Sequence, residues 1–201
     1  SEPRWLQPCG GPSLLHRALH LLDRLDEADE KLFWSDDSSI LEHFEQAGRT
    51  AIRLLPGPPV HALRRDQPGR PASHFVLRFD GRCPFLRPST LDEAVRLVRI
   101  RFDVSRMVSC VRTHGPLFSV SGRSLTPALG GTPCILRWSP AFDLAPADQL
   151  AGLAHDVACV AEAMPFELGA SEALRIDSSF EFDLVAAYFG ARRAAEASHG
   201  G

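Results

Sequence analysis

The sequence predicts an α+β fold, in which a mixed, largely antiparallel sheet is covered by helices within a single domain over residues 1–201. Segments with helical and with strand periodicity are interspersed along the chain. Turn signals at Asp80-Gly81 and in the 117–138 region favour antiparallel pairing. A chain of 201 residues is also long enough to bury one core. A flexible loop over 56–72 and a frayed tail over 198–201 are expected outside that core.

The amino-terminal region begins with the clearest helix. Ser13 can cap it, and leucines recur at helical spacing over 14–25. A short strand is predicted over 31–34. Ser39 and Glu42 have the spacing of a capping box, which predicts that a second helix begins there.

The next region has the patterning of strands and turns. A strand is predicted over 51–55, and 60–63 and 74–79 can form a hairpin around a proline-containing loop. Asp80-Gly81 is a strong turn signal. It predicts that 82–86 runs back along the preceding strand.

The centre of the chain contains one ambiguous stretch. Thr90 and Glu93 predict the start of a helix. Residues 98–112 fit both the end of that helix and a half-buried strand, and helix is favoured first. Two further strands are predicted over 117–120 and 134–138.

Proline positions organise the carboxy-terminal region. Pro146 is predicted to begin a helix that Pro165 ends. A strand is predicted over 173–176, and a last helix over 180–197.

Charge is segregated along the chain. Residues 1–52, 53–112 and 113–201 carry net charges of −5, +7 and −5, which give the overall −3. The arginines of the positive third are fork-shaped donors suited to phosphates or carboxylates. They are Arg64, Arg65, Arg70, Arg78, Arg82, Arg87, Arg96, Arg99, Arg101, Arg106 and Arg112. The alternative is that the acidic flanks pack beside this third and neutralise it.

Compartment and partners follow from composition. No apolar run is long enough to cross a bilayer, the amino-terminal segment lacks the order of a signal peptide, and five cysteines are scattered singly. A cytoplasmic protein without a membrane partner is therefore expected. An acidic protein or an anionic small molecule is a possible partner, whereas the net negative charge argues against nucleic acid.

The sequence contains no complete catalytic set, so the first functional hypothesis is a non-catalytic binding or accessory module. In this hypothesis Arg96, Arg99 and Arg101 bind the anion or acidic partner. Catalytic residues, a cofactor and the oligomeric state are not predicted. Cys83, which follows Arg82, is weighed as a reactive thiol against a packed one.

Two alternatives remain open. The segment Gln149-Leu150-Ala151-Gly152-Leu153-Ala154 resembles the Q/R-x-x-G-x-G/A element of the GCN5-related N-acetyltransferases. That resemblance implies an acyl-CoA-dependent N-acyltransferase, with Gln149, Gly152 and Ala154 at the pyrophosphate and Tyr188 as general acid. A metal-dependent enzyme is the second alternative, because His16 and His20 lie four residues apart on the first helix.

Overall fold

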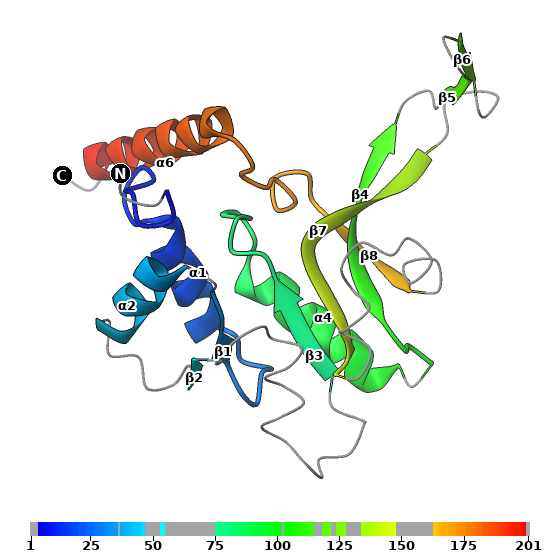
Figure 1. Ribbon diagram of the computed structural model, residues 1–201, viewed down its shortest axis with the longest axis horizontal. Helices are drawn as coiled ribbons and strands as arrows, with labels where there is room; N and C mark the ends of the chain where they lie inside the picture. The colour runs from blue at the N-terminus through cyan, green and yellow to red at the C-terminus, as the bar shows by residue number, and fades with distance from the viewer. Residues whose placement is uncertain are drawn as a thin grey trace.

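The protein is described by a computed structural model that covers residues 4–35, 37–46, 53–54, 75–101, 103–114, 118–121, 124–127, 134–147 and 163–199. Its main sheet has the strand order β3-β7-β4-β8 (Figure 1). These strands are Phe75–Phe79 (β3), Cys134–Pro146 (β7), Met107–His114 (β4) and Met164–Leu168 (β8). β7 is antiparallel to both neighbours, and β4 and β8 are parallel. The predicted mixed, largely antiparallel α+β fold is confirmed.

Two smaller sheets flank the main one. Leu32–Phe33 (β1) pairs in parallel with Arg53–Leu54 (β2), so strands occur inside both of the ranges predicted for them. Phe118–Ser121 (β5) and Ser124–Pro127 (β6) form an antiparallel ribbon beyond the ends of β4 and β7 (Figure 1).

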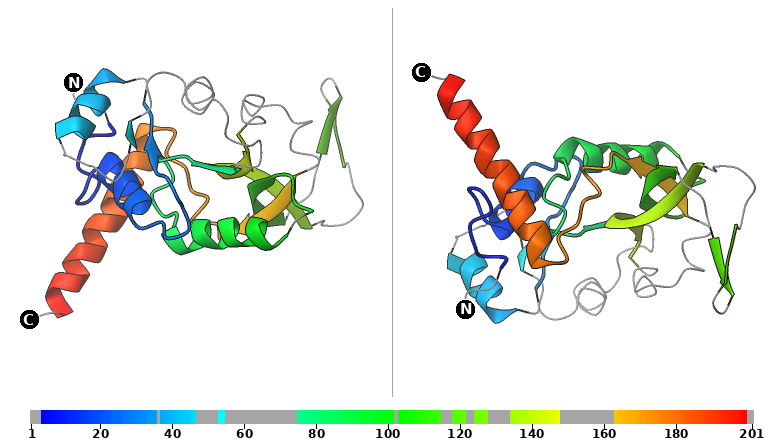
Figure 2. Two further views of the ribbon diagram at one scale, coloured as in Figure 1. Left: turned by 90° about the horizontal axis from the view of Figure 1, so that it is seen from below. Right: turned by 90° about the horizontal axis from the view of Figure 1, so that it is seen from above.

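The helices gather around the β3 edge of the sheet. Leu14–Asp23 (α1) and Ser38–Gln46 (α2) lie beyond that edge, and Pro88–Ile100 (α4) runs along one sheet face (Figures 1 and 2). Ser179–His199 (α6) crosses near α1 and then projects away from the rest of the molecule (Figure 2). The last predicted helix is therefore confirmed.

The core forms where α1 and α4 meet the sheet. Leucines of α1, the buried face of α4 and side chains of β4 and β7 belong to one buried cluster, in which Leu91 and Met107 are completely inaccessible. A second cluster joins Cys9 and Leu14 to Phe182 and Val185 of α6. Burial of this apolar surface is the main stabilising contribution and fixes α6 against the amino-terminal segment.

Helix starts were only partly predictable. Ser13 caps α1 as expected, because its hydroxyl accepts the N–H of His16. The cap of α2 is Asp37 and not Ser39: the Asp37 carboxylate accepts the N–H of Ser39 at 2.9 Å. The prediction that Thr90 caps a helix is also wrong, since α4 already begins at Pro88.

Several strand predictions are wrong because strands pair over long distances. Residues 82–86 do not return along β3; the neighbour of β3 is β7, with Phe79 opposite Phe142. In the ambiguous 98–112 stretch, α4 continues through Ile100 before β4 begins. The segment 173–176 is not a strand.

The two prolines also have other roles than predicted. Pro146 is the last residue of β7, opposite Phe75, and Pro165 lies within β8 at the sheet edge, where a missing N–H is tolerated. The predicted loop at 56–72, the strand at 60–63 and most of the helix predicted between the two prolines lie outside the described residues.

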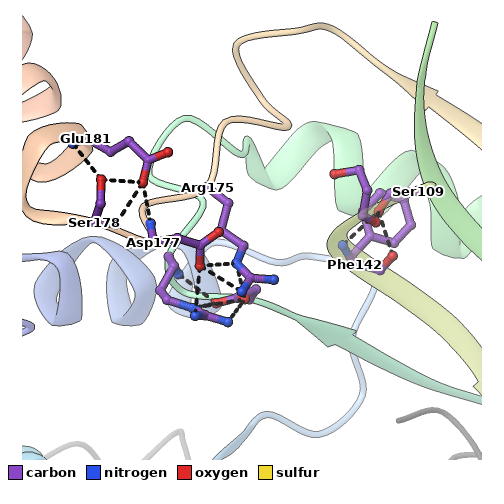
Figure 3. A network of polar contacts seen from close by, with 9 residues as sticks. Ser109, Phe142, Arg175, Asp177, Ser178 and Glu181 are labelled. Atoms are coloured by element: carbon purple, nitrogen blue, oxygen red, sulfur yellow. Dashed lines mark hydrogen bonds and ion pairs between the residues drawn. The ribbon is translucent and has the colours of Figure 1, made fainter. Parts of the chain in front are cut away.

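A buried serine supports the irregular pairing of β4 with β7. The register shifts between Val108 and Cys110. At this point the Ser109 hydroxyl lies 2.7 Å from the carbonyl oxygens of both Ser139 and Phe142, and it accepts the N–H of Phe142 at 2.9 Å (Figure 3). One side chain thus satisfies backbone groups that the regular ladder leaves unpaired.

We expect Ser109→Ala to lower the free energy of unfolding by about 1–3 kcal/mol, because buried backbone groups lose their partner. Chemical denaturation followed by circular dichroism measures this loss. Ser89→Ala, at an exposed serine of α4, is the control. An equal loss in both variants would contradict the role of Ser109.

Candidate functional site

A turn after β3 presents Asp80 at the end of the strand. The Asp80 N–H donates to the carbonyl of Ala141 at 2.8 Å, which extends the ladder by one residue. The Asp80 carboxylate then accepts the backbone N–H of Arg82 at 2.9 Å. A β-carbon at Gly81 would lie 3.1 Å from the Trp5 ring and 3.2 Å from Cβ of Ala18, so this turn packs closely on the amino-terminal segment.

A second carboxylate, that of Asp177, is positioned by the start of α6. Ser178 and Glu181 form a capping box: the Ser178 hydroxyl accepts the N–H of Glu181, and Oε2 of Glu181 accepts the N–H of Ser178 at 2.8 Å. Oε2 of Glu181 also accepts the N–H of Asp177 at 2.7 Å (Figure 3). The backbone that carries Asp177 is therefore held directly by the helix cap.

The two carboxylates meet at shared arginines. Arg82 Nη2 lies 2.7 Å from Oδ2 of Asp80, and its Nη1 lies 3.1 Å from Oδ1 of Asp177. Arg175 Nη2 lies 2.7 Å from Oδ1 of Asp177, and its Nε is 3.7 Å from Oδ2 of Asp80. We call Asp80, Arg82, Arg175 and Asp177 the Asp80–Asp177 cluster. A backbone bond from Ile176 N–H to the carbonyl of Arg82, 2.9 Å long, brings the two segments together.

The cluster is charge-balanced and open to solvent. The Asp80 side chain is 18% exposed and that of Asp177 is 51% exposed. The hydrogen bond to Asp80 raises the pKa of Arg82 above its ordinary value, although partial burial opposes this. Arg82 therefore remains cationic. Two carboxylates and two guanidinium groups at one accessible point suit a divalent cation together with phosphate groups.

The neighbouring Cys83 does not take part as a nucleophile. Burial, and next the charge of Asp80, raise the pKa of its thiol to about 12. The thiolate, which is the reactive form, is therefore scarce at neutral pH. The packed interpretation of Cys83 is the one that the structure supports.

The arginines predicted to bind a partner are already engaged by carboxylates. Arg96 Nε lies 2.9 Å from Oε1 of Glu27, and Arg99 Nη1 lies 2.7 Å from Oε2 of the same residue. Arg101 pairs with Asp103 at 2.7 Å. An anion would have to displace these carboxylates, and binding by Arg96, Arg99 and Arg101 stays a prediction.

The same compensation extends across the positive third. Arg78 forms a two-pronged pair with Asp143, and Arg87 and Arg112 pair in the same way with Glu172 and Glu167. The first two carboxylates are largely buried. All three carboxylates come from the acidic carboxy-terminal third. These pairs therefore agree with the alternative prediction, in which the acidic flanks neutralise the positive centre.

The alternative sites are placed as follows. Nδ1 of His16 lies 2.8 Å from the Ser13 hydroxyl and its ring packs against His43, while His20 is exposed. Within the described ranges, no group of three or more His, Cys, Asp or Glu side chains is placed to hold a metal. The acyl-CoA residues Gln149, Gly152 and Ala154 lie outside those ranges. Tyr188 is on α6, where its ring packs against Phe85 and Phe189.

Sequence reasoning used Asp80 only as a turn signal and passed over Arg175 and Asp177. A local signal was present for each carboxylate. Asp80 directly follows a predicted strand, and Asp177 directly precedes the S-x-x-E pattern of a helix cap. Nothing in the spacing indicated that these two points lie side by side.

Comparisons with solved structures reveal the same fold in nucleotide-using enzymes. The 4-diphosphocytidyl-2C-methyl-D-erythritol synthase of Anaerococcus prevotii matches with a TM-score of 0.64 and 14% identity, over 91% of this chain and 88% of that one. CMP:2-keto-3-deoxy-manno-octonic acid synthetase complexed with CTP matches at 0.67 and 13%, over 94% and 92%. The 2-C-methyl-D-erythritol 4-phosphate cytidylyltransferase of Francisella tularensis matches at 0.65 and 13%, over 94% and 93%.

The chain shares the fold of these solved structures. No family model and no curated protein sequence matches it. Among the helices of the described residues, none has the length and apolar character needed to span a membrane.

These comparisons overturn the first functional hypothesis. The structures that share this fold are enzymes, namely cytidylyltransferases, so the hypothesis of a non-catalytic binding or accessory module is wrong. The names of these structures give no support to the acyl-CoA alternative or to the metal alternative at His16 and His20. The physical reason for the error is that net charge was counted along the sequence. Such a count includes the arginines of the central third, but it does not show which carboxylates the fold places beside them.

We expect Ser178→Ala to lower the free energy of unfolding by about 1 kcal/mol, because α6 loses its side-chain cap. Thermal and chemical denaturation measure the loss. Ser179→Ala is the matched control, since the next serine along the chain lies inside the helix. A similar loss in both variants would show that the cap has no special role.

The capping box also predicts a pH dependence. Hydrogen bonds from the N–H groups of Asp177 and Ser178 and from the Ser178 hydroxyl lower the pKa of Glu181 in the folded protein. Its stabilising effect is therefore present above the ordinary glutamate pKa of about 4.3 and is lost as pH falls through the lower, folded value. The difference in melting temperature between the natural protein and Glu181→Ala should shrink over that window. A constant difference would contradict the assignment.

Proposed function

We propose that the protein is a nucleotidyltransferase that transfers a cytidine monophosphate unit from CTP to an acceptor and releases pyrophosphate. The observation that carries the proposal is the meeting of Asp80 and Asp177 at one guanidinium group, that of Arg82. The use of CTP by proteins of the same fold supports the choice of nucleotide.

The position of the cluster supports a substrate site. β3 and β4 run in the same direction, because each is antiparallel to β7, and Asp80 follows the carboxyl end of β3. Ligands of open sheets that contain parallel strands commonly bind beyond these carboxyl ends. The segment that leads into α6 adds Asp177 to the same cluster.

A divalent cation fits the two carboxylates. Oxygens of Asp80 and Asp177 contact the same guanidinium group, and carboxylate oxygens are the ligands that Mg²⁺ prefers. Mg²⁺ is commonly held by one or two carboxylates together with substrate phosphates, so two protein ligands suffice. When bound, the cation would neutralise phosphate charge. Asp80 and Asp177 would hold it.

The arginines supply the second half of the site. If a cation replaced these ion pairs at the carboxylates, Arg82 and Arg175 would be free to donate to phosphate oxygens. The acceptor oxygen forms a bond to the α-phosphorus of CTP. The bond from that phosphorus to the oxygen bridging to the β-phosphate breaks, and pyrophosphate leaves with this oxygen. The acceptor proton passes to solvent. Guanidinium groups stabilise the charge that develops on the leaving group.

Binding of CTP in the presence and absence of Mg²⁺ tests the proposal. Isothermal titration calorimetry should detect Mg²⁺-dependent binding that is tighter for CTP than for ATP, GTP or UTP. Asp80→Asn and Asp177→Asn should each weaken it by about tenfold or more, the scale on which altered metal-site residues act. Pyrophosphate release in the presence of candidate acceptors then measures turnover.

Asp103→Asn is the matched control. Asp103 pairs with Arg101 two residues away, just as Asp80 pairs with Arg82. Asp103 follows α4 in the sequence, whereas Asp80 precedes it, and Asp103 is not part of the Asp80–Asp177 cluster. This variant should bind CTP as the natural protein does. Mg²⁺-independent binding, or equal affinity in Asp80→Asn and Asp103→Asn, would overturn the assignment of the site.

A further inference from the structure

Two described arginines, Arg17 and Arg193, lie where α6 crosses the amino-terminal segment. Most described arginines pair with a carboxylate; these are Arg78, Arg82, Arg87, Arg96, Arg99, Arg101, Arg112, Arg175 and Arg192. Arg17 of α1 and Arg193 of α6 have no carboxylate partner among the described residues, and they approach one another where α6 crosses the amino-terminal segment.

Arg17 is held at this crossing by uncharged groups. Its Nη2 donates to the carbonyl of Cys9 at 3.2 Å, and its guanidinium carbon lies 3.5 Å from the ring centre of Phe189. Its Nε is buried and has no hydrogen-bond partner within the described part of the chain. These contacts orient the cation but leave its charge without a counter-ion.

Arg193 lies one helical turn beyond Phe189 and reaches the same loop. A β-carbon at Gly11 would lie 2.8 Å from Nη1 of Arg193 and 3.2 Å from its Cδ. Gly11 has φ +142°, and Gly10 has φ +62°, which L side chains rarely adopt. The two glycines thus let the loop approach α6 closely enough for Arg193 to lie against it.

The two cations repel one another. Burial lowers the pKa of Arg17, and the charge of Arg193 lowers it further. Arg17 nevertheless stays protonated at neutral pH, because arginine begins from a very high pKa. A pair of like charges at a packed helix crossing destabilises that crossing unless an anion lies between them.

We propose that Arg17 and Arg193 form a binding site for a small phosphate-type dianion, which stabilises the docking of α6 on the loop before α1. A dianion would balance both guanidinium charges and accept their fork-shaped donors. The site shares no residue with the Asp80–Asp177 cluster and does not depend on the proposed transferase activity.

Thermal unfolding with inorganic phosphate tests the proposal, at constant ionic strength balanced with chloride. Phosphate should raise the melting temperature of the natural protein along a saturating curve, because a ligand that binds only the folded state stabilises it. In Arg193→Ala the half-saturating concentration should rise by about tenfold or more, as expected when a charge-assisted interaction is lost. Without phosphate, this variant should be at least as stable as the natural protein, because the repulsion is gone.

Arg192→Ala is the matched control, since Arg192 is the neighbouring arginine of α6 and pairs with Glu196. This variant should keep the natural phosphate response. A third arm uses glycerol 3-phosphate: a lower half-saturating concentration than for inorganic phosphate would assign the site to the phosphate group of a larger molecule, and an equal or higher one to free phosphate. The proposal is overturned if phosphate gives no saturating shift, or if Arg193→Ala responds as Arg192→Ala does.

Discussion

The contact of Arg82 with Asp177 is the constraint on which the candidate site depends. It joins residues 95 positions apart and is reinforced by the backbone bond from Ile176 to Arg82. Through it the turn after β3 and the start of α6 share one set of polar groups. The Ser178–Glu181 cap holds the backbone of Asp177 from the helix side. The turn after β3 therefore positions Asp80, and the helix cap positions Asp177.

Charge segregation along the chain becomes charge pairing in three dimensions. Arginines of the positive central third form ion pairs with Glu27 of the amino-terminal third and with Asp143, Glu167 and Glu172 of the carboxy-terminal third. Each exposed pair contributes little stability by itself. Their combined effect is specificity, because a wrong docking of helix or strand would leave several arginines or carboxylates without partners.

The pattern also separates structural charge from functional charge. At the Asp80–Asp177 cluster, carboxylates and guanidinium groups are balanced but accessible, so a cation and phosphates can replace the internal pairs. At Arg17 and Arg193 the charges remain unbalanced within the described residues. Both arrangements are suited to anions, but for opposite reasons. At the Asp80–Asp177 cluster an anion would replace carboxylates that already pair with the arginines. At Arg17 and Arg193, among the described residues, no carboxylate has to be replaced.

The sequence by itself determined the α+β class and the elements whose signals are local. Leucine spacing and Ser13 located α1, strand residues between turn signals located β3, and α6 was expected over 180–197, because periodicity and capping act within a few residues. It misplaced the starts of α2 and α4, which begin at Ser38 and Pro88, because competing local signals lay within two residues of each other.

Only the tertiary structure decided that β7 lies beside β3 and that Asp80 and Asp177 meet. Strand order and carboxylate proximity depend on contacts between segments far apart in sequence, and no spacing rule encodes them. The same reason explains why the arginines were found from composition but their partners were not. A charge is a property of one residue, whereas its neutralisation is a property of the fold.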